Sequence, residues 1–166
     1  ALKAALSIAE GHGAITELLD VRELDLPLFV PDLPVELYPA QHQPSISRLI
    51  DVCRRASGMI WSSPTYHGTV SGAFKNTVDF LELLRDDQPP YLQGRPVALM
   101  TVPDASTLSA MVDSVHELRA WLAPTRVVIR ADDFTESLSL HNDIERRITR
   151  LVHELLDFVE RKETKM

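Results

Sequence analysis

Cysteine and long uncharged runs are scarce in this 166-residue sequence, and each scarcity excludes a class of protein. The single Cys53 cannot form a disulfide within the chain, which excludes a disulfide-stapled scaffold and favours a reducing, cytoplasmic environment. Cys53 lies on the apolar face of a predicted helix, so we expect it to be buried. The longest stretch without Asp, Glu, Lys or Arg is Ala56–Phe74. It contains a proline, glycines and several hydroxyl residues, so it does not predict a membrane-spanning helix.

Positive charge is also in short supply. The chain has 17 Lys and Arg residues against 24 Asp and Glu residues, a formal net charge of −7. Nonspecific binding to nucleic acid or to an anionic membrane needs basic patches. We therefore expect neither nucleic acid nor a membrane as a partner.

Helical and extended patterns alternate along the chain, which indicates a single α/β domain over residues 1–166. The extended segments are continuous apolar runs, typical of parallel strands that are buried on both faces. We therefore expect a three-layer sandwich, with helices on both faces of a parallel sheet. The predicted helices cover residues 1–10, 46–56, 72–84, 107–122 and 142–162, and the predicted strands cover residues 14–19, 59–61, 97–102 and 126–131. Residues 25–44 hold five of the 11 prolines and predict a long irregular connection.

No group of side chains forms a recognisable catalytic or metal-binding constellation. Gly11 and Gly13 begin like a dinucleotide-binding fingerprint, but Thr16 occupies the place of the third glycine and the segment ends a helix. The six histidines include no pair at the spacing of three or four residues that ligands on a helix use. The arginine cluster in Arg146–Arg150 is interpreted as the solvated face of the last helix.

Residues 62–80 carry the strongest functional signal. They follow a predicted strand and lead into a predicted helix, the position where open α/β sheets bind ligands. Pro64 restricts the backbone, and Gly68 permits close approach to it. Backbone N–H and C=O groups at this position, with Tyr66 for apolar contact, suit a flat heteroaromatic ring with alternating donors and acceptors. Ser71 is expected to cap the following helix rather than to act as a nucleophile.

This segment resembles the signature of the NADPH-dependent FMN reductase family, a group of flavodoxin-like flavoproteins. The family pattern is Pro-x-Tyr-Asn/His-Gly followed by Ser/Pro-Gly-x-x-Lys-Asn-x-x-Asp. The matching residues here are Pro64, Tyr66, His67, Gly68, Ser71, Gly72, Lys75, Asn76 and Asp79. The resemblance implies a flavodoxin-like parallel sheet of strand order 2-1-3-4-5. It also implies that the isoalloxazine ring of FMN is bound by the backbone of Pro64, Thr65, Tyr66, His67 and Gly68. For Lys75, a structural tether to nearby carbonyls or to Asp79 is preferred over contact with the cofactor, and Asp79 is likewise expected to be structural.

The family commonly has a glycine-rich loop after the next strand, which contacts the ring from the other side. The corresponding residues 101–107 contain no glycine. By resemblance, Val102, Pro103 and Asp104 are expected to contact the ring through backbone groups. Helix capping is the alternative role of Asp104.

The family's phosphate-binding loop lies between the first strand and the first helix, whose N-terminus holds the phosphate. Neither that strand nor that loop is found in the sequence. We therefore expect residues 1–166 to be an N-terminally incomplete flavodoxin-like domain that lacks about 15–25 residues, one strand and one short loop.

The resemblance implies an FMN-dependent oxidoreductase that uses NAD(P)H as co-substrate and reduces a small-molecule electron acceptor such as a flavin or a quinone. Hydride transfer needs no side-chain acid or base, so no catalytic residue is predicted. Two alternatives remain: an electron-transfer protein without NAD(P)H turnover, and a flavin-free interaction domain. The family generally forms a homodimer or homotetramer, and the helix faces Phe80/Leu84 and Met111/Val115 are candidate contacts, with core packing as their alternative role.

Overall fold

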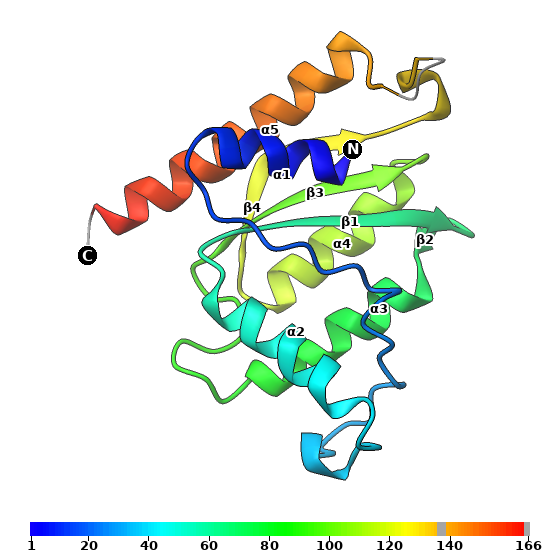
Figure 1. Ribbon diagram of the computed structural model, residues 1–166, viewed down its shortest axis with the longest axis vertical. Helices are drawn as coiled ribbons and strands as arrows, with labels where there is room; N and C mark the ends of the chain where they lie inside the picture. Colours follow the sequence, from blue (N-terminus) through cyan, green and yellow to red (C-terminus); the bar gives the residue numbers. More distant parts are fainter. Residues whose placement is uncertain (136–138, 165–166) are drawn as a thin grey trace.

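The computed structural model describes residues 1–135 and 139–164 and has the expected three-layer α/β arrangement (Figure 1). The sheet has the order β2-β1-β3-β4, in which β1, β3 and β4 are parallel and β2 is antiparallel to β1. No helix among the described residues is both long enough and apolar enough to cross a membrane. The elements are α1 (Leu2–Gly11), η1 (Val35–Leu37), α2 (Gln43–Arg55), β1 (Met59–Tyr66), β2 (Thr69–Val70), α3 (Gly72–Asp79), η2 (Phe80–Leu84), β3 (Pro96–Val102), α4 (Ser106–Glu117), β4 (Trp121–Val128), η3 (Ala131–Asp133) and α5 (Asn142–Glu163).

Strand β3 lies at the centre of the sheet and is buried on both faces. Val97 and Leu99 face one hydrophobic cluster, Ala98 and Met100 face the other, and all four side chains are fully buried. Successive side chains of a strand point to opposite faces, so an uninterrupted apolar run is what a doubly covered strand requires. The sequence-based prediction of this strand is confirmed.

Helices cover the two faces of the sheet separately. Helices α1 and α5 pack on one face, and α2, α3 and α4 lie on the other (Figure 1). The side chains of Phe80, Leu84, Met111 and Val115 are fully buried beneath this second layer. These four residues therefore belong to the core, which confirms the second of the two roles expected for them and excludes them as contacts between subunits.

The predicted strand at residues 14–19 is absent, and the segment is an extended connection without regular secondary structure. Its Ile15 side chain is fully exposed. An extended segment becomes a strand only when a neighbouring backbone accepts and donates its hydrogen bonds. Among the described residues, the outer side of β1 pairs only with β2, at Thr65 and Tyr66, and residues 14–19 pair with no strand.

Two other strand boundaries differ from the prediction. Strand β1 continues past residue 61, because its parallel pairing with β3 extends as far as Pro64 opposite Val102. Strand β4 begins at Trp121, inside the predicted helix, because Arg119 adopts a left-handed conformation with φ of 59° and ends α4. The apolar spacing continues across this break, so periodicity alone did not reveal it.

The long connection before α2 is held down by aromatic packing. The ring of Phe29 lies edge-on to that of Phe80, with centroids 5.4 Å apart, and the centroids of the Tyr38 and Phe80 rings are 5.5 Å apart. The Val30 backbone N–H donates to the Tyr38 hydroxyl at 2.8 Å. These contacts give the irregular segment a defined path across the α2–α3 layer.

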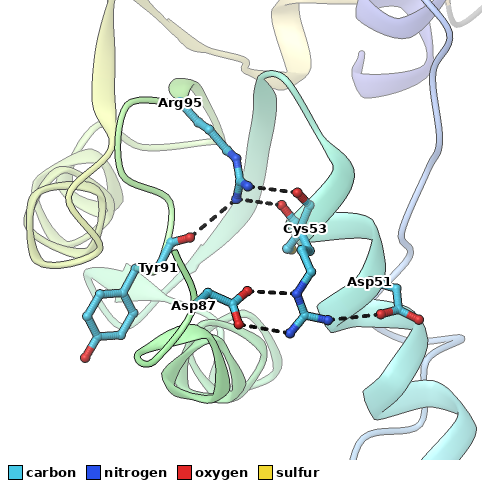
Figure 2. A network of polar contacts seen from close by, with 6 residues as sticks. Asp51, Cys53, Asp87, Tyr91 and Arg95 are labelled. Carbon is cyan, nitrogen blue, oxygen red and sulfur yellow. Dashed lines mark hydrogen bonds and ion pairs between the residues drawn. The ribbon is translucent and has the colours of Figure 1, made fainter. Parts of the chain in front are cut away.

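Arg95 joins the end of α2 to the start of β3 (Figure 2). Its guanidinium donates to the carbonyl oxygens of Cys53 at 2.9 Å, Arg54 at 2.8 Å and Tyr91 at 3.3 Å. The last carbonyls of a helix have no partner within it, and a nearby cation satisfies them. Arg54 in turn forms an ion pair with Asp87 at 2.7 Å, so this network fixes the end of the sheet at which β1 and β3 begin, opposite their carboxyl ends.

Candidate functional site

The predicted ring-binding segment ends β1 and forms a tight hairpin. Pro64, Thr65 and Tyr66 are the last residues of β1, and Tyr66 pairs with Thr69 of β2. The two residues between them, His67 and Gly68, both have positive φ, 51° and 82°. Two-residue hairpins favour this left-handed geometry, because it matches the twist of the paired strands.

The second predicted segment lies beside the first. Val102 ends β3, where it is the parallel partner of Pro64, and Pro103 and Asp104 follow it into the loop before α4. Parallel strands place their carboxyl ends along one edge of the sheet. The structure thus brings residues 64–68 and 102–104 together.

A chain of hydroxyl groups connects these two segments. The Thr107 hydroxyl donates to Thr65 Oγ1 at 2.7 Å, and Thr65 Oγ1 donates to the carbonyl oxygen of Asp104 at 3.1 Å. Thr101 Oγ1 donates to the Ser63 carbonyl oxygen at 3.0 Å and lies 3.3 Å from Thr65 Oγ1. Thr101 and Thr107 are fully buried, so these bonds replace water as partners of their hydroxyls.

Sequence reasoning did not single out Ser63, Thr101 or Thr107. A usable signal is the presence of Ser or Thr at the end of each of two neighbouring strands and in the first turn of the next helix. Hydroxyls at those positions cross-link loops, because each can both donate and accept. Their pairing could be known only once the strands were in register.

Ser63 also positions the helix that follows the hairpin. Its Oγ accepts the backbone N–H of Ser71 at 3.1 Å, and Ser71 Oγ accepts the N–H of Phe74 at 3.2 Å. Ser71 is therefore the N-cap of α3, as predicted, and its hydroxyl oxygen is engaged in that role.

The lysine, asparagine and aspartate of the motif serve the scaffold. Lys75 forms an ion pair with Asp79 one turn later on α3. Asn76 Nδ2 donates to the carbonyl oxygen of Pro27 at 2.8 Å, and Asn76 Oδ1 accepts the backbone N–H of Phe29 at 2.9 Å. The predicted tether between Lys75 and Asp79 is confirmed, and Asn76 fastens the proline-rich connection to α3.

The edge of the sheet presents apolar surface beside these polar groups. The side chains of Tyr66 and Val102 are 60% and 38% exposed, although each lies at the end of a strand. Asp104 Oδ1 accepts the backbone N–H of Ser106, the first residue of α4, at 2.7 Å, whereas the N-cap position itself is Ala105. Hydrogen bonds from the Ser106 backbone and side chain lower the pKa of Asp104, so this loop carries a negative charge at neutral pH.

Comparisons with known proteins agree with this geometry. A sequence model of the family described as NADPH-dependent FMN reductase matches residues 1–135. The NADPH-dependent FMN reductase ArsH of Acidithiobacillus ferrooxidans is 32% identical over 110 residues, 66% of this chain and 42% of that protein. A quinone reductase of Escherichia coli K12 is 36% identical over 78 residues, 46% of this chain and 38% of that protein.

A solved structure shows the same fold. The flavoenzyme NAD(P)H:(acceptor) oxidoreductase FerB of Paracoccus denitrificans superimposes with a TM-score of 0.73 at 19% identity, covering 96% of this chain and 87% of FerB. The expected flavodoxin-like α/β fold is thereby confirmed. The matched regions span less than half the length of the curated relatives named above. From the family match over residues 1–135 and the shared fold, the chain belongs to the NADPH-dependent FMN reductase family.

Proposed function

We propose that this domain binds FMN at the carboxyl edge of the sheet and works as an NAD(P)H-dependent oxidoreductase toward a small-molecule acceptor. The observation that carries the proposal is the juxtaposition of residues 64–68 and 102–104, cross-linked by buried threonine hydroxyls. Membership of the NADPH-dependent FMN reductase family supports FMN as the cofactor and NAD(P)H as the reductant.

The groups at this edge suit a flavin ring. Tyr66 and Val102 offer exposed apolar surface, and the hairpin turn at His67 and Gly68 offers backbone groups beside it. The ring of FMN is flat, apolar on its faces and lined with donors and acceptors at its rim, which is the combination that such a loop pair can bind. The residues proposed to contact it are Pro64, Thr65, Tyr66, His67, Gly68, Val102, Pro103 and Asp104.

FMN, when bound, supplies the hydride and electron chemistry. The contribution of this chain is to bind and orient. The hydroxyl chain from Thr107 through Thr65 links the two loops, and the hydrogen bond from the Ser106 N–H to Asp104 links the second loop to the start of α4. No residue of the chain is assigned the role of acid or base.

The test compares FMN binding by the Tyr66→Ala and Trp121→Ala variants. Trp121 is a matched control, because its 59% exposure is close to the 60% of Tyr66. It begins β4 and so lies at the opposite end of the strands. Loss of an aromatic contact of about 1 kcal/mol corresponds to roughly a fivefold weaker Kd, so Y66A should weaken FMN binding to about this extent or more. W121A should bind like the unmodified protein.

Activity is measured on the same preparations as the rate of NADPH and NADH oxidation with FMN and a quinone present. Protein that neither binds FMN nor oxidises either nucleotide contradicts the proposal and favours a flavin-free interaction domain. Protein that binds FMN but leaves it oxidised in the presence of both nucleotides is instead an electron-transfer protein.

We also propose that the protein forms a homodimer or homotetramer in the cytoplasm. The helix faces first considered as subunit contacts lie in the core. Support for an assembly therefore comes from the connection before α2, which carries exposed apolar side chains at Ile15, Leu28, Val30 and Leu37. Contiguous exposed apolar surface is typical of contact surfaces, and Leu28 and Val30 are only two residues apart in this segment. The buried, unpaired Cys53 is consistent with a reducing compartment. Light scattering at micromolar concentration gives the mass of the assembly.

A further inference from the structure

A cleft of about 560 Å³ lies along the outer edge of β4, between α4 and α5. Its volume falls within the roughly 300–1,000 Å³ of small-molecule sites, although the cleft is open to solvent along this edge rather than enclosed. Three arginines line it, one from β4 and two from α5, and we call it the arginine cleft. The residues that matter for its chemistry are Ala105, Leu108, Thr125, Arg126, Arg147 and Arg150.

The cleft is a built feature of the sheet edge. Between the pairs Val97–Leu122 and Leu99–Arg126, β4 has two more residues than β3, so the edge strand bulges outward there. Glu154 of α5 holds the bulge in place, accepting the Thr125 backbone N–H at 2.8 Å and the Thr125 hydroxyl at 2.9 Å.

The guanidinium groups in the cleft are only partly neutralised. Arg150 forms an ion pair with Glu154 at 2.9 Å. Arg147 donates to the carbonyl oxygen of Arg126 at 3.2 Å and, within residues 1–135 and 139–164, has no carboxylate partner. Arg126 likewise has no ion-pair partner in the part of the chain that the structure describes. Three cations therefore face one carboxylate, in a chain whose net charge is −7.

This concentration of arginine is chemically selective. Guanidinium groups bind phosphate through two parallel N–H···O bonds, and of the three arginines only Arg150 has, among the described residues, a carboxylate, that of Glu154, competing for its guanidinium. The exposed Pro124 and the largely buried Leu108 add apolar surface to the lining. A phosphate-bearing organic molecule satisfies both requirements, whereas a simple metal cation or an uncharged ring satisfies at most one.

The arginine cleft adjoins the proposed flavin site. Ala105 follows Asp104 directly in the chain, and Val128, which also lines the cleft, is the parallel partner of Thr101 at the end of β3. A molecule seated in the cleft thus lies next to residues 102–104 rather than on a remote surface.

From the charge, the apolar lining and this position, we propose that the arginine cleft binds the phosphate-bearing adenosine half of the reducing nucleotide, an inference that rests on the proposed function. Arg126 and Arg147 are the groups that contact phosphate. The adjacent Arg146 is not part of the site, because it pairs with Asp143 and does not line the cleft.

The experiment measures binding of 2′,5′-ADP by calorimetry, with 5′-AMP and inorganic phosphate as comparison probes. Charge-assisted hydrogen bonds are among the strongest polar contacts, so Arg126→Ser and Arg147→Ser should each weaken 2′,5′-ADP binding roughly tenfold. Arg147→Lys should weaken it less, because it keeps the charge but loses the paired geometry. Arg146→Ser removes the same charge one residue away and should leave the Kd unchanged.

Three results would overturn the inference. They are equal binding by R126S, R147S and the unmodified protein, an equal loss in R146S, and inorganic phosphate binding as tightly as 2′,5′-ADP. All three arginines are exposed, and matching thermal unfolding curves verify that the variants fold. Because 2′,5′-ADP binding does not require flavin, it can persist when FMN binding fails, which would contradict the proposed function alone.

Discussion

Replacement of Asn76 by alanine tests whether this residue fastens the proline-rich connection to α3, a role that we call the structural latch. In the native fold, the Asn76 amide makes two hydrogen bonds across a large sequence separation, one to Pro27 and one to Phe29. Alanine removes both and leaves a backbone carbonyl and a backbone N–H without these partners. Both bonds are only partly buried, so water can replace some of what is lost.

The expected magnitude follows from these two bonds. A net contribution of about 1 kcal/mol for each hydrogen bond predicts that N76A lowers the free energy of unfolding by about 2 kcal/mol. For a chain of this size, that corresponds to a decrease in Tm of roughly 4–8 °C. Asn76→Asp keeps an acceptor for the Phe29 N–H but loses the donor to Pro27. At neutral pH it should lower the free energy of unfolding by a similar or larger amount.

The neighbouring Lys75→Ala variant is the matched control. The Lys75–Asp79 ion pair is exposed, with side chains 57% and 35% accessible, and such pairs contribute roughly 0.3–0.5 kcal/mol. Urea unfolding followed by circular dichroism measures all three variants. Proteinase K should also cleave the proline-rich connection faster in N76A. The latch interpretation is refuted if N76A lies within 0.5 kcal/mol of the unmodified protein or if K75A is equally destabilised.

Two further predictions concern ionisable groups. Burial raises the pKa of the Cys53 thiol to about 11, so at pH 8 roughly one thiol in a thousand is ionised. Labelling of Cys53 by a disulfide reagent should therefore be slow until urea unfolds the chain. Rapid labelling of the folded protein would contradict this prediction. Desolvation raises the pKa of Glu154, but hydrogen bonds from Arg150 and Thr125 outweigh it, and the net pKa lies below the ordinary 4.5. A carboxyl group whose pKa is lowered in the folded state stabilises the fold above its unfolded-state pKa, and this stabilisation is lost as the pH falls through its native-state pKa. Glu154→Gln should therefore reduce the difference in the free energy of unfolding between pH 6 and pH 3. An unchanged difference would show that Glu154 contributes nothing to acid sensitivity.

Several parts of the fold were predictable from local signals. The central strand β3 was predicted because a run buried on both faces must be apolar throughout, and α5 because its apolar residues recur with the helical period. The N-cap role of Ser71 and the tether between Lys75 and Asp79 also follow from short-range geometry. Each of these features depends on residues within about one turn or one strand of one another.

The errors arose where the outcome depends on distant partners. Residues 14–19 have the composition of a strand but remain a connection, because no neighbouring backbone pairs with them in the described structure. Trp121 continues a helical pattern but begins β4, because it pairs with Pro96. Phe80 and Met111 were ambiguous between core and contact surface until the packing of the layers placed them inside.

The sequence by itself determined the alternation of elements, the family resemblance and the segment, residues 64–68, at which a ligand is expected. Only the tertiary structure decided what lies opposite that segment. The hydroxyl chain from Thr107 to Thr65 exists because parallel pairing sets Pro64 against Val102, and the arginine cleft exists because the bulge in β4 meets α5. Contacts between residues about 20 to 40 positions apart depend on strand register and helix packing, and these are properties of the whole folded chain that no local pattern encodes.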